Sequence, residues 1–155
     1  MRKKILPGCI VEISVHNMFY SYAQVLKYGY WAYFEGKYDT PLNHTELIIK
    51  NDVLFIVNTS CVDAIKNGRW KIVDRLPLDS KFEVLPMQYV YDNALKRYAI
   101  YNPNTGELTQ NIYTKDDVLG MECCAVWYDN HIEDRLFAYY EGKECPWLEI
   151  CGKIE

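Results

Sequence analysis

The chain has 155 residues, half of them hydrophobic and a quarter charged, which is typical of a globular protein with a buried core. No apolar run approaches the ~20 residues that a membrane-spanning helix needs. The basic start of the chain differs from a signal peptide, because Pro7-Gly8 interrupts its apolar stretch. We therefore expect one cytoplasmic domain over residues 1–155 and no membrane partner.

The net charge of −4 is unevenly distributed along the chain. Residues 1–115 carry 14 basic and 11 acidic side chains, whereas residues 116–155 carry 3 basic and 10 acidic ones. An acidic lobe repels nucleic acid and attracts basic partners. The C-terminal part therefore predicts either a protein-binding surface or an ordinary solvated helix face.

Alternating apolar residues predict strands near the N-terminus. Residues 8–15 read as a half-buried strand, and residues 20–28 and 30–34 as two further strands rich in tyrosine. An irregular loop is expected over residues 35–41, which contain Gly36, Asp39 and Pro41. The uniformly apolar residues 53–57 predict a strand covered on both faces.

The middle of the chain reads as short elements. Capping patterns at Asn43 and Ser60 predict two short helices, and residues 70–73 a strand. Residues 87–91 and 97–101 predict a hairpin, and a further strand is expected at 108–112. Residues 121–128 stay ambiguous between strand and helix. The expected fold is α+β: a largely antiparallel, twisted sheet with a few short helices.

One amphipathic helix is predicted at the C-terminal end of this domain. Asn130 and Glu133 have the spacing of a capping box, and Gly142 supplies the left-handed residue that ends a helix. Ile132, Leu136 and the pair Tyr139/Tyr140 share one face, which is expected to pack on the sheet. The acidic side chains lie off this stripe, so they are predicted to form an exposed negative back.

Known catalytic and metal-binding motifs are missing from the sequence. His16, His44 and His131 lie in separate segments without carboxylates at ligand spacing, so no catalytic residue, metal or cofactor is predicted. The six cysteines form no C-x-x-C pair and are expected to be reduced. Basic residues flank Trp70 and Tyr98. Because the net charge of the chain is negative, we interpret them as residues at strand ends and not as a nucleic-acid surface.

Short segments along almost the whole chain resemble the immunity protein 26 family, bacterial proteins that neutralise toxins of contact-dependent systems. The matching segments are Pro7-Gly8, residues 22–26, 34–35, 53–57, 69–73 and 76–78, Pro86, and residues 120–122, 126–127 and 131–136. Cys9 departs from the family-like opening, and the chain beyond Gly142 matches little. The residues in these segments that we expect to be structural are Gly8, Trp70, Glu122, Trp127, Arg135 and Leu136, with Glu122 and Arg135 as an ion pair.

The resemblance implies inhibition by binding a cognate toxin domain, without chemistry. A toxin that cuts nucleic acid is expected to be basic, because it must bind phosphate. One candidate surface is the back of the last helix, and the other is the tyrosine face of the second strand with the following loop. The candidate contact residues are Asp129, Glu133, Asp134, Tyr140 and Glu141 on the helix, and Tyr22 and Glu35 elsewhere.

A different class of protein is also compatible with the opening of the chain. Pro7-Gly8 and the strands that follow are compatible with a small-barrel endoribonuclease of the PemK type, or with an RNA-binding protein. Such a protein needs a positive groove beside the first loop. The toxin's identity and the oligomeric state are left open by the sequence.

Overall fold

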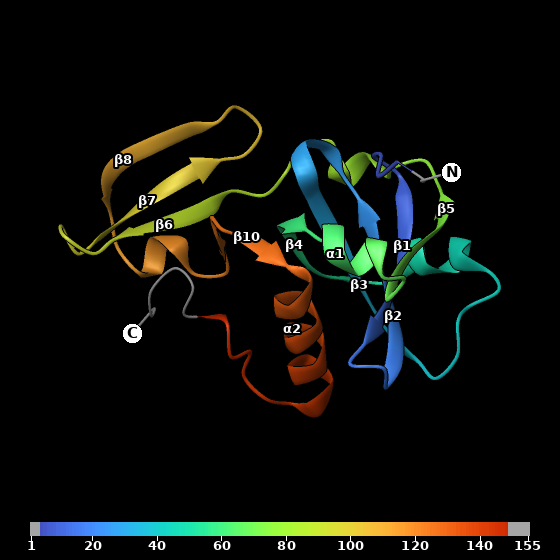
Figure 1. Cartoon of the computed structure of the whole chain (residues 1–155). Coiled ribbons are helices and arrows are strands. Elements are labelled where there is room, and N and C mark those ends of the chain that lie inside the picture. The colour runs from blue at the N-terminus through green and yellow to red at the C-terminus, as the bar shows by residue number, and fades with distance from the viewer. Residues whose placement is uncertain (1–3, 149–155) are drawn as a thin grey trace. The chain divides into compact units, whose positions relative to one another are not determined.

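The computed structural model describes residues 4–148, apart from the side chain of Gln110. These residues belong to two compact units, which are described separately (Figure 1). Unit 1 contains the chain up to Leu78 together with Val126–Pro146, and unit 2 begins with Asp79–Ala125. The expectation of one domain over residues 1–155 stays a prediction.

A six-stranded sheet forms the centre of unit 1. Its strands follow the order β10-β4-β3-β2-β1-β5, and only the β10–β4 pair is parallel. The bounds are β1 Cys9–Val15, β2 Phe19–Val25, β3 Tyr30–Tyr38, β4 Val53–Ser60, β5 Trp70–Arg75 and β10 Val126–Tyr128. Short helices connect them: η1 Lys27–Gly29, η2 Thr45–Lys50 and α1 Val62–Lys66.

The β1–β2 hairpin closes through a tight turn at His16 and Asn17. Both residues have positive φ angles, 50° and 57°, and the Met18 N–H bonds to the Val15 carbonyl at 2.9 Å, as in a type I′ turn. Both strands are buried on both faces. The expectation of a half-buried strand over residues 8–15 is therefore wrong, because both sides of β1 are covered by other parts of the chain.

The third strand runs further than expected. β3 continues to Tyr38, which pairs with Tyr20 across an irregularity in the β2–β3 register. The predicted loop at residues 35–41 is thus strand over its first half. Pairing with β2 overrides the turn-forming residue types in this segment.

Helix α2, Asp129–Glu141, packs against β1 and β10 (Figure 1). It ends at Gly142 in the left-handed conformation, as predicted. Its start differs from the prediction: Tyr128 is the N-cap, and its N–H donates to His131 Nδ1 at 3.2 Å. Asn130 is therefore inside the helix, and Glu133 is directed elsewhere.

Aromatic residues form much of the core of unit 1. Trp31, Trp70 and Trp127 are fully buried, and the Trp31 and Trp70 rings lie 5.9 Å apart. The Arg135 guanidinium lies over the Phe55 ring at 3.7 Å and over the Trp127 ring at 4.9 Å. Such cation–π contacts contribute most where water is excluded.

Unit 2 contains a smaller sheet of strand order β8-β7-β6-β9. The strands are β6 Gln88–Asp92, β7 Arg97–Asn102, β8 Glu107–Tyr113 and β9 Glu122–Cys123, with η3 at Ser80–Phe82 and η4 at Asp116–Val118. The predicted hairpin is the β6–β7 pair. The core of unit 2 contains Tyr89, Tyr98, Val118 and Cys123.

The α+β class and the C-terminal helix on a mainly antiparallel sheet are confirmed. The ambiguous residues 121–128 form two short strands, β9 in unit 2 and β10 in unit 1. Among residues 4–148, no helix is long and apolar enough to cross a membrane.

The cysteines differ from the expectation at one position. Of those that the structure describes, Cys9, Cys61, Cys124 and Cys145 are reduced thiols, whereas Cys123 is disulfide-bonded. Cys151 lies outside the described residues. The expectation of reduced thiols is therefore wrong at Cys123.

Candidate functional site

The predicted acidic back of α2 is not an exposed surface at Glu133. Its side chain is buried, with 3% of the residue exposed, and its carboxylate accepts three hydrogen bonds. The donors are the His16 N–H at 3.0 Å, Arg69 Nη1 at 3.0 Å and the Trp70 indole at 3.1 Å. Glu133 is therefore a structural residue, and its prediction as a partner contact is corrected.

Two further carboxylates of α2 are also engaged within unit 1. Asp129 is half-buried and bonds to Arg69 Nη2, so Arg69 joins two turns of the helix to the start of β5. The bonded Asp129 raises the pKa of the Arg69 guanidinium. Asp134 pairs with His16 Nε2 at 3.0 Å. These contacts bind α2 to the sheet and leave only Glu141 as an exposed acidic residue among the four predicted.

Tyr22 is also placed differently from the prediction. It is fully buried; its hydroxyl donates to Glu12 Oε2 at 3.0 Å and accepts from the Leu42 N–H at 2.7 Å. Burial and the adjacent Glu12 carboxylate raise the pKa of Tyr22 well above its ordinary value. The segment around Leu42 covers Tyr22, so this tyrosine is not available to a partner.

The structure instead brings together residues from both candidate surfaces. Tyr139, near the end of α2, is 47% exposed, and its hydroxyl donates to Glu35 Oε1 on β3 at 3.2 Å. Tyr140 packs edge-on against Tyr139 with ring centroids 4.9 Å apart, and its hydroxyl accepts from the Gly36 N–H at 2.7 Å. Tyr140 is half-buried, so Tyr139 is the exposed tyrosine of this pair.

Asp52 completes this surface, which we call the Tyr139 patch: Glu35, Asp52, Tyr139 and Tyr140. The Asp52 carbonyl accepts from the Glu35 N–H at 2.8 Å, which brings the start of β4 beside β3. Partial burial and the carboxylates of Glu35 and Asp52 raise the pKa of the Tyr139 hydroxyl. The patch is thus an exposed aromatic ring beside two negative charges.

The residues predicted to be structural lie largely as expected. Trp70, Trp127 and Leu136 are in the core, and Gly8 has φ +95° with its N–H bonded to the Val25 carbonyl. Arg135 stacks on aromatic rings in unit 1. Glu122 lies opposite Gln88 in the β6–β9 strand pair of unit 2. The proposed Glu122–Arg135 ion pair stays a prediction.

Sequence reasoning missed Arg69, His16, Asp52 and Tyr139 as the residues that organise these contacts. Arg69 lies about sixty residues from its partners on α2, and His16 lies more than a hundred residues from Glu133. The sequence pattern predicts Tyr139 on the buried stripe, although the stripe has room for only one of two adjacent tyrosines. Two tyrosines in succession on a helix are the signal that one of them faces outward.

Among the described residues, no group of three or more His, Cys, Asp and Glu side chains is arranged to hold a metal ion. No protein-family model, curated protein or solved structure matches this chain.

Proposed function

We propose that this chain is an immunity-type inhibitor that binds a cognate bacterial toxin domain through the Tyr139 patch and covers the toxin's active surface. The observation that carries this proposal is the pairing of an exposed, oriented tyrosine with two carboxylates. Such a ring loses little conformational entropy on binding, because its hydroxyl is already held by Glu35. Aromatic anchors of this kind commonly dominate the energy of protein interfaces.

The proposed partner is basic. Glu35 and Asp52 flank Tyr139, and Lys37, the nearest cation along β3, is occupied over the Phe19 ring at 5.0 Å. Toxins that act on nucleic acid carry positive grooves for phosphate, and an acidic inhibitor can occupy such a groove. Opposite charge also accelerates encounter between the two proteins. A nuclease domain is therefore the toxin class that this patch fits best.

The test uses the toxin encoded by the neighbouring reading frame. We expect cells that produce both proteins to grow, and the two purified proteins to form a stable complex on size-exclusion chromatography. Growth arrest despite abundant, folded inhibitor would contradict the proposal. A parallel incubation of the purified chain with RNA tests the alternative function. Cleavage of the RNA would support an endoribonuclease of the PemK type and contradict the inhibitor function.

A further inference from the structure

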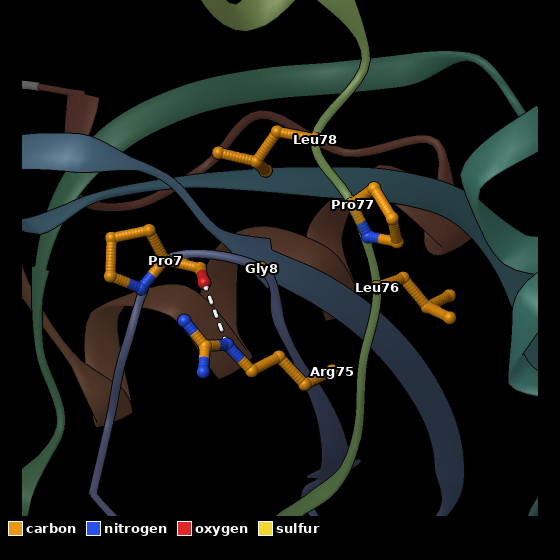
Figure 2. A pocket seen from close by; sticks show the side chains of 6 residues that line it. All are labelled: Pro7, Gly8, Arg75, Leu76, Pro77 and Leu78. Carbon is orange, nitrogen blue, oxygen red and sulfur yellow. Dashed lines mark hydrogen bonds between the residues drawn. The ribbon is translucent and has the colours of Figure 1, made fainter.

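A surface hollow of about 420 Å³ lies in unit 1, where the start of β1 meets the segment that follows β5. Arg75 is the one charged residue among those that line it, and the others contribute apolar side chains and backbone (Figure 2). The lining residues are Pro7, Gly8, Arg75, Leu76, Pro77 and Leu78. The hollow thus combines apolar walls with a single cation.

The two segments that form this hollow are held closely together. The Leu76 N–H donates to the Gly8 carbonyl at 2.9 Å, and the buried Gln24 Nε2 donates to the carbonyls of Gly8 and Leu76 at 3.3 and 3.1 Å. The rings of Pro7 and Pro77 fix the φ angle on each side. A ligand would therefore meet walls that are already formed, which lowers the entropy cost of binding.

Arg75 lies at this hollow with most of its hydrogen-bonding capacity unused. Its Nε donates to the Pro7 carbonyl at 3.2 Å, and Figure 2 shows its side chain reaching toward Pro7. Within residues 4–148, its two Nη groups have no hydrogen-bond acceptor and no ion-pair partner. A guanidinium fork fits a carboxylate through two parallel N–H···O bonds. One cation balances one carboxylate, whereas a phosphate dianion would keep an unpaired charge against apolar walls.

A second hollow, of about 380 Å³, is also lined by Arg75. Its other lining residues include Leu6 and Cys9, together with Lys4 and Asp74, whose charges are opposite. The carboxylate of Asp74 already accepts from the Arg75 N–H at 2.8 Å. This second hollow therefore offers room beside the cation without a further unbalanced charge.

The shape of the two hollows indicates which kind of carboxylate they fit. Four of the six residues that line the first hollow are exposed, so it is open to solvent. A site for a free small molecule buries most of the ligand's surface. The end of a polypeptide needs less cover, and its preceding residues can occupy the second hollow. We propose that Arg75 and its two hollows bind the free C-terminal carboxylate of a partner protein whose last residue is apolar.

The probe is an N-acetylated pentapeptide, Ser-Gly-Ser-Val-Leu, with a free C-terminal carboxylate. It is titrated at low salt into the isotopically labelled full chain and followed by NMR. We expect saturable shifts centred on the amides of Gly8, Arg75, Leu76 and Leu78. The same peptide with a C-terminal amide should bind about tenfold more weakly, because it lacks the charge that Arg75 recognises. N-Acetyl-leucine should also bind several-fold more weakly, because it leaves the second hollow empty.

Three variants assign the binding to Arg75 and its hollow. Arg75→Gln should lose about tenfold in affinity for the carboxylate peptide and bind the amide peptide unchanged. Leu78→Asp keeps Arg75 but places a carboxylate beside it, and should also lose about tenfold for the carboxylate peptide. The matched control, Lys71→Gln, removes an exposed cation of the same strand that does not line the first hollow. Its affinity should be unchanged.

Several results would overturn this proposal. They are equal affinity for the carboxylate and amide peptides, equal losses in Arg75→Gln and Lys71→Gln, shifts centred outside residues 4–10 and 72–78, or no saturation up to about 5 mM peptide. N-Acetyl-leucine that binds as tightly as the pentapeptide would also overturn it, in favour of a free small acid.

This inference does not depend on the proposed toxin partner. The Tyr139→Ala variant should bind the peptide as the original chain does. Failure of toxin rescue with intact peptide binding would remove the inhibitor function alone, and the reverse result would remove only the Arg75 site.

Discussion

The carboxylate of Glu133 on α2 accepts a hydrogen bond from the indole of Trp70 on β5 at 3.1 Å, inside the core of unit 1. The same carboxylate meets Arg69 and the His16 backbone, so one side chain connects α2, the β1–β2 turn and the sheet edge. A buried carboxylate with three hydrogen-bond donors is well satisfied, but each of these donor groups loses its acceptor if the carboxylate is removed.

Replacing Glu133 by alanine should therefore lower the free energy of unfolding by about 3–5 kcal/mol, because Arg69 and the Trp70 indole lose a buried acceptor. Glu133→Gln keeps one acceptor oxygen and should cost less. The measurement is urea unfolding followed by tryptophan fluorescence. Glu141→Ala, at an exposed position of the same helix, is the control and should stay within about 0.5 kcal/mol. Similar values for Glu133→Ala and Glu141→Ala would contradict this role.

Gly8 is predicted to tolerate no side chain. Its φ is +95°, and a Cβ there would lie 2.6 Å from the Leu76 carbonyl oxygen. Gly68 has a similar φ of +79° but open space where a Cβ would lie, so it isolates the backbone strain. Gly8→Ala should destabilise the protein by about 1–3 kcal/mol more than Gly68→Ala in the same unfolding assay. Equal losses would mean that the segment around Leu76 moves away from a Cβ at residue 8 at no cost in stability.

Local patterns predicted the elements whose partners are near in sequence. The β6–β7 hairpin follows from two alternating runs, and the end of α2 follows from Gly142. In each case the determining contacts lie within a few residues.

The site could not be predicted in the same way, because its contacts are long-range. Glu133 follows the rule for an exposed helix position until Arg69 and Trp70 arrive from β5. Tyr22 follows the rule for an exposed strand face until residue 42 covers it. The sequence places the acidic residues on α2 correctly, but which of them stay exposed depends on distant cations.

Cys61 should resist alkylation in the folded protein. Burial, with a smaller effect of Asp129, raises the pKa of its thiol from 9.0 to about 12, and only the thiolate reacts rapidly. Mass spectrometry after iodoacetamide treatment at pH 8.5 should find Cys61 unmodified when folded and modified in urea. Rapid labelling in the folded protein would contradict this prediction.

The same shift predicts a pH dependence of stability. The unfolded thiol loses its proton near pH 9, whereas the folded one keeps it to about 12, so the unfolded state binds fewer protons between these values. The Cys61 contribution is complete below pH 9 and decreases as the pH rises toward 12. Cys61→Ala should flatten this decrease relative to the original chain, while Cys145→Ala serves as the control. An unchanged slope would show that Cys61 ionises alike in both states.

For the proposed function, the decisive residues are Tyr139 and Glu35. Tyr139→Ala should weaken toxin binding by about 30-fold or more, as expected of a central aromatic anchor. Tyr28→Ala is the matched control, because Tyr28 is 65% exposed in the same unit but lies under the Lys27 ammonium, 5.5 Å away. Isothermal titration with the purified toxin domain gives both values. Comparable losses at the two tyrosines would place the interface elsewhere.

Charge reversal tests the electrostatic half of the same surface. Glu35→Lys should slow association about tenfold at low salt and flatten its salt dependence, because attraction between the acidic patch and a basic toxin accelerates encounter. Glu46→Lys reverses an exposed carboxylate that instead faces His44 at 3.3 Å, so its association rate should change less than threefold. Stopped-flow fluorescence at two ionic strengths measures both rates. If Glu35→Lys accelerates association, the toxin presents an acidic face, and the basic partner is the wrong class.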